Sequence, residues 1–180
     1  MEQEKTLYTL LVYSENIAGI LNQITAVFTR RQVNIESLNV SASSIEGLHK
    51  YTITAWSDED QITKITKQIE KKIDVVKAQY YRDDELYIRE TGLYKLSTPE
   101  VMANPEISRT VRRNDAFITE VNPIYVIVMK SGRTEEIMAL YDKLNAFGCI
   151  LQYTRSGRIA VTRSTEEEVS RYLEEREKRA

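Results

Sequence analysis

The chain has 180 residues, of which 42% are apolar and 29% are charged, and its formal net charge is -2. This is the balance of a globular protein with one domain or two small ones, without the positive charge that nucleic acid and anionic membranes select. No apolar run is long enough to span a bilayer, and the acidic N-terminus lacks the basic start of a signal peptide. The single cysteine, Cys149, cannot form a disulfide within the chain. We therefore expect a cytoplasmic protein with neither nucleic acid nor membrane as its partner.

The first half of the chain predicts the order β-α-β-β-α-β. Runs of β-forming residues predict strands at 6–13, 35–41, 48–56 and 75–81. Asn16 is expected to cap the first helix, whose apolar face is Ile17, Ile20, Leu21, Ile24, Val27 and Phe28. Asp58 and Gln61 resemble a capping box for the second helix, whose apolar stripe is Ile62, Ile65, Ile69 and Ile73. This order is typical of a ferredoxin-like fold.

The second half predicts a similar arrangement after the charged segment Arg82–Glu85, the best candidate for a linker. Thr98–Pro99 and Asn104–Pro105 each place a cap residue before a proline, and Thr134 is expected to cap a later helix that ends before Gly148. The predicted strands are 86–96, 116–121, 124–129, 150–154 and 159–162, and a last helix begins near Ser164. We therefore predict an α+β protein of two ferredoxin-like domains, at residues 1–82 and 83–180.

The residues that could carry catalysis are few. His49 lies inside a predicted strand, where a lone histidine is more often structural, and Cys149 has no base beside it in the pattern. No cysteine and histidine spacing indicates a metal site, and the six glycines are too scattered for a phosphate-binding loop. We predict neither catalytic residues nor a metal site in this chain.

The junction between the first strand and the first helix carries an unusual glycine. The pattern puts Gly19 in the first helical turn, where alanine is more favourable by up to about 1 kcal/mol. One interpretation is a small ligand that approaches the backbone, where the free amide groups of the helix favour a carboxylate. The other is close packing of the strand on the helix, and the pattern leaves both open.

The residues around this junction resemble those of a known family. Asn16-Ile17-Ala18-Gly19-Ile20-Leu21 resembles the "N-x-x-G-x-L" turn of ACT domains, which are small-molecule regulatory domains. With the segment Asn34–Leu38, it is similar to the small subunit of acetohydroxyacid (acetolactate) synthase. The second half resembles the C-terminal domain of that family in four places: Arg89–Glu90, Leu93–Leu96, Asn122–Pro123 and Thr154–Gly157.

The resemblance implies a homodimer through the ACT domain that binds a branched-chain amino acid, typically valine, at its interface. It implies that this chain activates a large catalytic subunit and confers feedback inhibition, with thiamine diphosphate, Mg and FAD bound by the large subunit and no cofactor here. Carried over by position, the effector-binding residues are those of the turn together with two from the partner chain: Asn16, Ile17, Ala18, Gly19 and Ile20, with Asn34 and Ile35.

The sequence departs from the family pattern at two places. The family often has Arg-Gly before the Asn-Ile-Glu-Ser motif, whereas this chain has Arg31-Gln32-Val33, so a residue with a side chain must end the helix. The segment Ser97–Ala103 resembles an insertion, and the sequence assigns it no role.

Three other functions are compatible with parts of the pattern. The first is a different ACT-type amino-acid sensor acting on another partner. The second is an RNA-binding module of the same strand order, although residues 48–53 lack the basic, glycine and aromatic run of such modules. The third is a stand-alone enzyme that uses glutamate or tyrosine side chains.

Overall fold

The computed structural model describes residues 5–165 and 168–178, which form two compact units. The first unit combines the chain up to Tyr87 with the segment from Arg158 onward, and the second unit is Ile88–Gly157. Each unit has a four-stranded antiparallel sheet with helices, which confirms the predicted α+β class. Among the described residues, no helix is long and apolar enough to cross a membrane.

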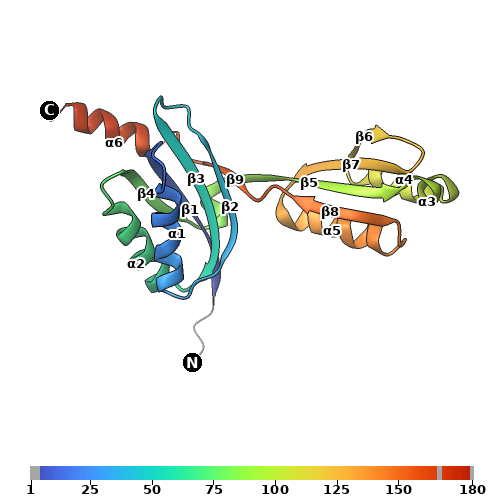
Figure 1. Cartoon of the computed structure of the whole chain (residues 1–180), viewed down its shortest axis with the longest axis horizontal. Coiled ribbons are helices and arrows are strands. Elements are labelled where there is room, and N and C mark those ends of the chain that lie inside the picture. Colours follow the sequence, from blue (N-terminus) through green and yellow to red (C-terminus); the bar gives the residue numbers. More distant parts are fainter. Residues whose placement is uncertain (1–4, 166–167, 179–180) are drawn as a thin grey trace. The chain divides into compact units, whose positions relative to one another are not determined.

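The first unit contains its elements in the predicted order (Figure 1). These are β1 (Thr6–Glu15), α1 (Ile20–Arg30), β2 (Ile35–Ala42), β3 (Leu48–Ser57), α2 (Glu59–Glu70) and β4 (Val75–Tyr81). The strand order is β2-β3-β1-β4, so β2 and β4 are the edges. Both helices pack on one face, because Ile24 of α1 and Ile65 of α2 share a core with Val12 of β1 and Ile53 of β3.

Strand β1 is buried on both faces of this sheet. Leu10 and Val12 face the two helices, whereas Leu11 and Tyr13 face the opposite side. On that side Leu11 and Tyr13 line a small hollow with Thr162 of β9 (Ile159–Thr162) and Val169 of α6 (Glu168–Glu177). The C-terminal segment therefore covers part of the second face, which explains why β1 has an almost continuous apolar run instead of an alternating one.

The second unit follows a short 3-10 turn, Asp83–Glu85, within the predicted linker. Its elements are β5 (Leu86–Ser97), α3 (Thr98–Ala103), α4 (Pro105–Arg113), β6 (Phe117–Val121), β7 (Tyr125–Gly132), α5 (Thr134–Asn145) and β8 (Ile150–Arg155). The strand order is β6-β7-β5-β8. Strand β5 begins in the first unit, which includes Leu86 and Tyr87, and β9 also pairs with β5. Val101, Ile107 and Leu140 place all three helices on one face, in a core with Tyr94 and Val128. The segment that resembled an insertion is thus α3, which contributes Val101 to this core.

Two of the predicted helix caps are confirmed and two are displaced. The Asp58 carboxylate accepts from the Gln61 N–H at 2.7 Å, and the Asn104 side chain accepts from the Glu106 N–H at 3.1 Å. Thr98 and Thr134 are the first residues of their helices and not the caps. Each helix therefore begins one residue earlier than the sequence pattern predicts. The Thr98 hydroxyl donates to the carbonyl of Asn122, and at the start of α5 the Arg133 N–H donates to the Glu136 carboxylate.

The predicted isoleucine stripe of α2 is wrong at its last member. Ile62, Ile65 and Ile69 are buried, whereas Ile73 is 99% exposed. Helix α2 ends at Glu70, so the chain leaves the helical path before it reaches Ile73.

These two isoleucines provide a matched test of the first core. Ile69→Ala should lower the free energy of unfolding by about 2–5 kcal/mol, because it leaves a cavity in a fully packed site. Ile73→Ala should change it by less than about 0.5 kcal/mol, since almost the whole Ile73 side chain is exposed. Denaturant unfolding of both variants measures this, and equal losses would contradict the position of Ile73.

Candidate functional site

The candidate site is the turn between β1 and α1, and its geometry differs from the prediction at Asn16 and Gly19. Helix α1 begins at Ile20, so the residue in the cap position is Gly19, with φ of 91° and ψ of -12°. Asn16 lies earlier in the turn, where its N–H donates to the carbonyl of Gly47 at 3.2 Å. The predictions that Asn16 caps the helix and that Gly19 lies in its first turn are therefore wrong. The left-handed backbone at Gly19 makes the sharp entry into the helix.

The conformation of Gly19 bears on the two interpretations of this glycine, namely a ligand that approaches the backbone and close packing of the strand on the helix. A Cβ atom built on Gly19 would have no heavy atom within 4 Å, so close packing of strand on helix is not the reason for glycine. The positive φ is a sufficient reason, because residues with a side chain are strained there. The open space beside Gly19 also leaves room for a group that approaches the backbone.

The N-terminus of α1 has no compensating group of its own. Gly19 contributes no side-chain cap, and the first turn contains no acidic residue. The N–H groups of Leu21 and Asn22 have no acceptor among the residues that the structure describes. Helices α2, α4 and α5, by contrast, have acidic residues in their first turns, and α2 and α4 also have side-chain caps. An anion at α1 would meet two free N–H groups and the positive end of the helix dipole.

Apolar side chains lie beside this helix end. Ile17 is 44% exposed and Leu21 is 41% exposed, although both belong to the apolar face that the sequence predicts for the helix. Ile20 is buried in the core, so its side chain supports the turn from below, while Ala18 is exposed. The sequence pattern did not predict Leu21 as a site residue, because its exposure, like that of Ile17, is visible only in the fold.

Asn34 and Ile35 lie at the other end of α1. Asn34 is exposed just before β2, and Ile35 is half-buried against the core at the start of this edge strand. Helix α1 has 11 residues, which separates its ends by about 16 Å. One chain therefore does not bring Gly19 and Asn34 within reach of the same small molecule. Gln32, which stands where the family often has glycine, keeps the left-handed conformation with φ of 54°.

The residues considered for catalysis have structural surroundings. His49 is half-buried in β3, opposite Ser14 of β1 and Ala42 of β2. Cys149 is fully buried, and this burial raises the pKa of its thiol, which keeps it protonated. The described part of the chain contains no group of three histidine, cysteine, aspartate or glutamate side chains placed to hold a metal ion.

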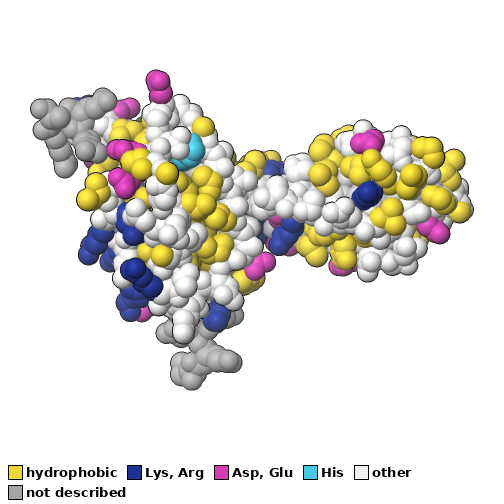
Figure 2. Space-filling model, viewed as in Figure 1, with side chains coloured by type: hydrophobic (Ala, Val, Ile, Leu, Met, Phe, Trp, Pro, Cys, Tyr) yellow, Lys and Arg dark blue, Asp and Glu magenta, His cyan; other side chains and the backbone are white. Residues whose placement is uncertain are grey.

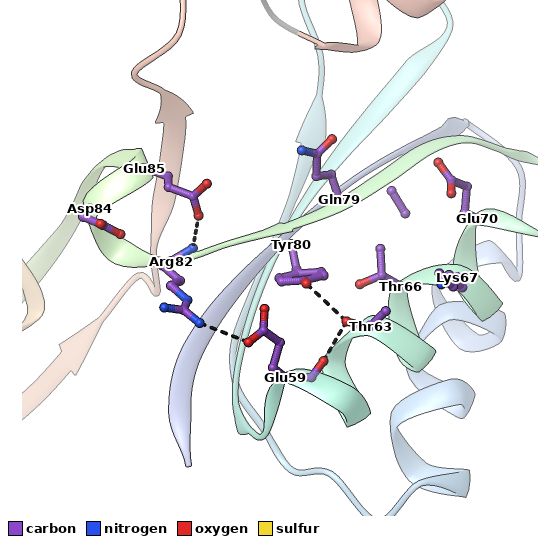
Figure 3. A pocket seen from close by; sticks show the side chains of 11 residues that line it. Glu59, Thr63, Thr66, Lys67, Glu70, Gln79, Tyr80, Arg82, Asp84 and Glu85 are labelled. Atoms are coloured by element: carbon purple, nitrogen blue, oxygen red, sulfur yellow. Dashed lines mark hydrogen bonds and ion pairs between the residues drawn. The ribbon is translucent and has the colours of Figure 1, made fainter. Parts of the chain in front are cut away.

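A second hollow lies between α2 and the edge strand β4, with a volume of about 610 Å³ (Figure 3). Two pairs of its polar side chains contact each other: Thr63 donates to the Tyr80 hydroxyl at 3.2 Å, and Arg82 pairs with Glu59 at 3.2 Å. It contains none of the residues that the sequence predicts for effector binding. Its walls are mostly charged and polar, which suits an aliphatic side chain poorly.

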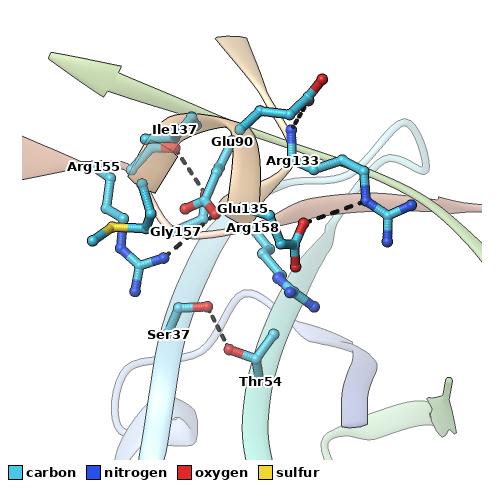
Figure 4. A network of polar contacts seen from close by, with 12 residues as sticks. Ser37, Thr54, Glu90, Arg133, Glu135, Ile137, Arg155, Gly157 and Arg158 are labelled. Carbon is cyan, nitrogen blue, oxygen red and sulfur yellow. Dashed lines mark hydrogen bonds and ion pairs between the residues drawn. The ribbon is translucent and has the colours of Figure 1, made fainter. Parts of the chain in front are cut away.

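Two of the four motifs of the second half, Arg89–Glu90 and Thr154–Gly157, meet in the second unit (Figure 4). Arg155 lies 3.5 Å from the buried carboxylate of Glu90, and Thr91 and Ser156 join the same segments through two hydrogen bonds of 2.9 and 3.0 Å. The other carboxylate oxygen of Glu90 has no hydrogen-bond partner among the described residues. Arg89–Glu90 and Thr154–Gly157 therefore hold β5 and the end of β8 together.

Comparison with known proteins places the chain. Residues 10–77 match the model of the AHAS small subunit-like ACT domain, and residues 89–164 match that of the small subunit of acetolactate synthase. The acetolactate synthase small subunit of Bacillus subtilis is 32% identical over 168 residues, covering 92% of this chain and 95% of its own. A probable acetolactate synthase small subunit of Methanothermobacter thermautotrophicus is 30% identical, covering 92% of this chain and 98% of its own.

A solved structure agrees with the sequence relatives. The crystal structure of the acetolactate synthase small subunit from Thermotoga maritima has a TM-score of 0.79 and 25% identity, and it covers 89% of this chain and 99% of its own. Both halves of the chain thus match the same kind of protein, in the same order. The chain belongs to the family of acetolactate synthase small subunits, the regulatory, non-catalytic subunits of that enzyme.

Proposed function

We propose that this chain binds valine, or a closely related branched-chain amino acid, between two ACT domains and thereby controls a large catalytic subunit. The observation that carries the proposal is the bare N-terminus of α1, with exposed apolar side chains beside it. The effector's carboxylate would accept from the N–H groups of Leu21 and Asn22. Its aliphatic side chain would pack against Ile17 and Leu21, where binding removes apolar surface from water.

The remaining part of the site would come from a second copy of the chain. An ammonium group needs an acceptor, and the amide oxygen of Asn34 can provide one. Because Asn34 lies at the far end of α1 in its own chain, it can meet Gly19 only across an interface. Ile35 of the same partner would extend the apolar wall.

The edge of the first sheet supports such an interface. Strand β2 is an edge strand, and Val40 on it is 38% exposed. An isologous contact along this edge would place the two β2 strands, and with them the two α1 helices, antiparallel. The N-terminus of each α1 would then lie near the C-terminal end of its partner, where Asn34 stands.

Regulation would follow from differential binding. The effector can shift the holoenzyme only if it binds one state of the complex more tightly than another. The thiamine diphosphate, Mg and FAD belong, in this proposal, to the large subunit, and this chain's own residues bind only the effector and the partner proteins.

Reconstitution tests the proposal as a whole. The purified chain alone should form no acetolactate from pyruvate. Added to its purified large subunit, it should raise the activity and make it sensitive to valine, leucine or isoleucine. Activity assays with each amino acid identify the effector, and a reconstituted enzyme insensitive to all three would assign the chain to a different signal.

Gly19 provides a sharper test. Gly19→Asp should weaken effector binding by about 100-fold or more, because its charge opposes the carboxylate at close range. Activation of the large subunit should remain, since aspartate is favourable at a helix N-terminus. Calorimetric titration of valine and the activity of the reconstituted complex measure the two effects.

The matched control is Gly19→Asn, which adds the same bulk and the same backbone strain without the charge. It should weaken binding less than Gly19→Asp does. If both variants bind valine as wild type does, the turn is not the site, and if both lose helical structure by circular dichroism, Gly19 serves the fold alone.

Mixing two defective variants tests whether the site is shared. Gly19→Asp and Asn34→Lys homodimers should each bind valine too weakly to detect, because the first places a negative charge beside the carboxylate and the second a positive charge beside the ammonium. After unfolding and refolding together, about one quarter of the sites should be intact, because half of the dimers are mixed and each mixed dimer regains one complete site. Calorimetry gives the number of sites. No recovery on mixing would show that the site lies within one chain or elsewhere.

A further inference from the structure

The second unit leaves one face of its sheet uncovered. Helices α3, α4 and α5 all pack on the face that carries Tyr94 and Val128. On the opposite face, Phe117 is 64% exposed and Leu93 is 41% exposed. Figure 2 shows hydrophobic side chains gathered on this unit, with few charges among them. An apolar sheet face without a covering layer indicates an interaction surface.

The strand register arranges this face in two rows. Met129 of β7 is opposite Leu93 of β5 and Phe117 of β6, so Leu93, Met129 and Phe117 form one apolar row across three strands. Two residues along β7, Ile127 is opposite Lys95 and Glu120, so over the same three strands the second row has a base on one side and an acid on the other. Strand β8 extends the two rows with Thr154 and Gln152, which are polar and uncharged. Residues directly opposite on neighbouring strands lie on the same face, so the two rows are adjacent.

The charged ends of the second row are held in place but are not paired with opposite charges. The ammonium of Lys95 lies 4.3 Å from the ring centroid of Tyr125, and the Tyr125 hydroxyl donates to Glu120 at 2.8 Å. Within the described part of the chain, neither Lys95 nor Glu120 makes a salt bridge. Each presents its charge at the border of an apolar surface.

We propose that this face binds the same face of a second copy of the chain. In this contact a two-fold axis runs parallel to β7, midway between the two facing sheets. It places β7 of one copy over β7 of the other, and β5 of one copy over β6 of the other. The first row then places Leu93 on Phe117 of the partner subunit, with Met129 near its own copy on the axis. The second row places Lys95 opposite Glu120 of the partner subunit, twice per dimer.

The charge pattern is the reason to choose a second copy over another protein. An isologous interface requires that a surface complement itself, and a row with a base, an apolar centre and an acid does so under this rotation. Packed sheets stand about 10 Å apart with their strands nearly aligned, which the apolar side chains of both rows can fill. This contact is separate from the proposed contact of the ACT domains, since it uses only residues of the second unit.

Cross-linking in the full chain tests the contact. Met129→Cys places a thiol near the axis, and a bis-maleimide that spans about 10 Å should join two chains at micromolar concentration. Ala139→Cys on the exposed side of α5 is the matched control and should give no more than background. Wild type, whose only cysteine is fully buried, measures that background.

Charge exchange then tests the predicted pairing. In the Met129→Cys chain, Lys95→Glu or Glu120→Lys should each reduce the cross-linked fraction at least about tenfold, because like charges meet twice per dimer. The double variant with both exchanges should restore it. Failure to restore, or equal cross-linking of Met129→Cys and Ala139→Cys, overturns the proposal. So does a Met129→Cys thiol that reacts freely in the chain alone and is protected only by the purified large subunit, which would assign the face to that subunit.

Discussion

The left-handed backbone at Gly19 is the constraint on which the turn between β1 and α1, and the exposed N-terminus of α1, depend. It lets the chain leave the buried strand β1 and enter α1 within four residues, without an amide or carboxylate side chain in the cap position. The cost is a helix that begins with free N–H groups and no acidic residue. A helix end of this kind in water is an incomplete anion site, and the other helices of similar length avoid it with acidic first turns. Because a side chain at Gly19 would both strain the turn and fill the space before α1, one residue determines the path of the backbone and the access to the helix.

The order and type of the elements in each unit were predictable because they depend on patterns of neighbouring residues in the sequence. Apolar residues at helical spacing marked α1, α2, α4 and α5, and β-forming runs marked the strands. The errors came from features that depend on the rest of the fold. Asn16 is a good cap by residue type, but the helix begins only at Ile20, after Gly19. The backbone at Asn16 is instead bonded to the carbonyl of Gly47, which lies 31 residues further along the chain. Ile73 continues the spacing of α2, but the helix has already ended. The return of residues 159–162 to β5 likewise has no local signal.

The candidate site was predictable only in part. Resemblance to the family identified the segments, and no spacing argument would have paired Gly19 with Asn34, because a helix separates them in the chain. The structure adds what the motif lacks, namely the two unpaired N–H groups and the exposed Leu21. It also confirms the consequence of the missing glycine at position 32. Gln32 adopts φ of 54° at a cost of about 1–2 kcal/mol, so the path from α1 into β2 is preserved although the preferred residue is absent.

Both proposed surfaces place their function at contacts between identical chains, and this has a thermodynamic consequence. If the effector binds only where Gly19 of one chain meets Asn34 of another, then it binds the dimer and not the monomer, and by mass action it stabilises the dimer in return. A contact between the uncovered sheet faces of the second units would hold two chains together whether or not the effector is present. The protein concentration required for sensing would then be set by the second units, and the effector would act on the arrangement of the first units within an existing assembly. The apolar rows of the second sheet would thus keep the response to the amino acid independent of the abundance of the chain.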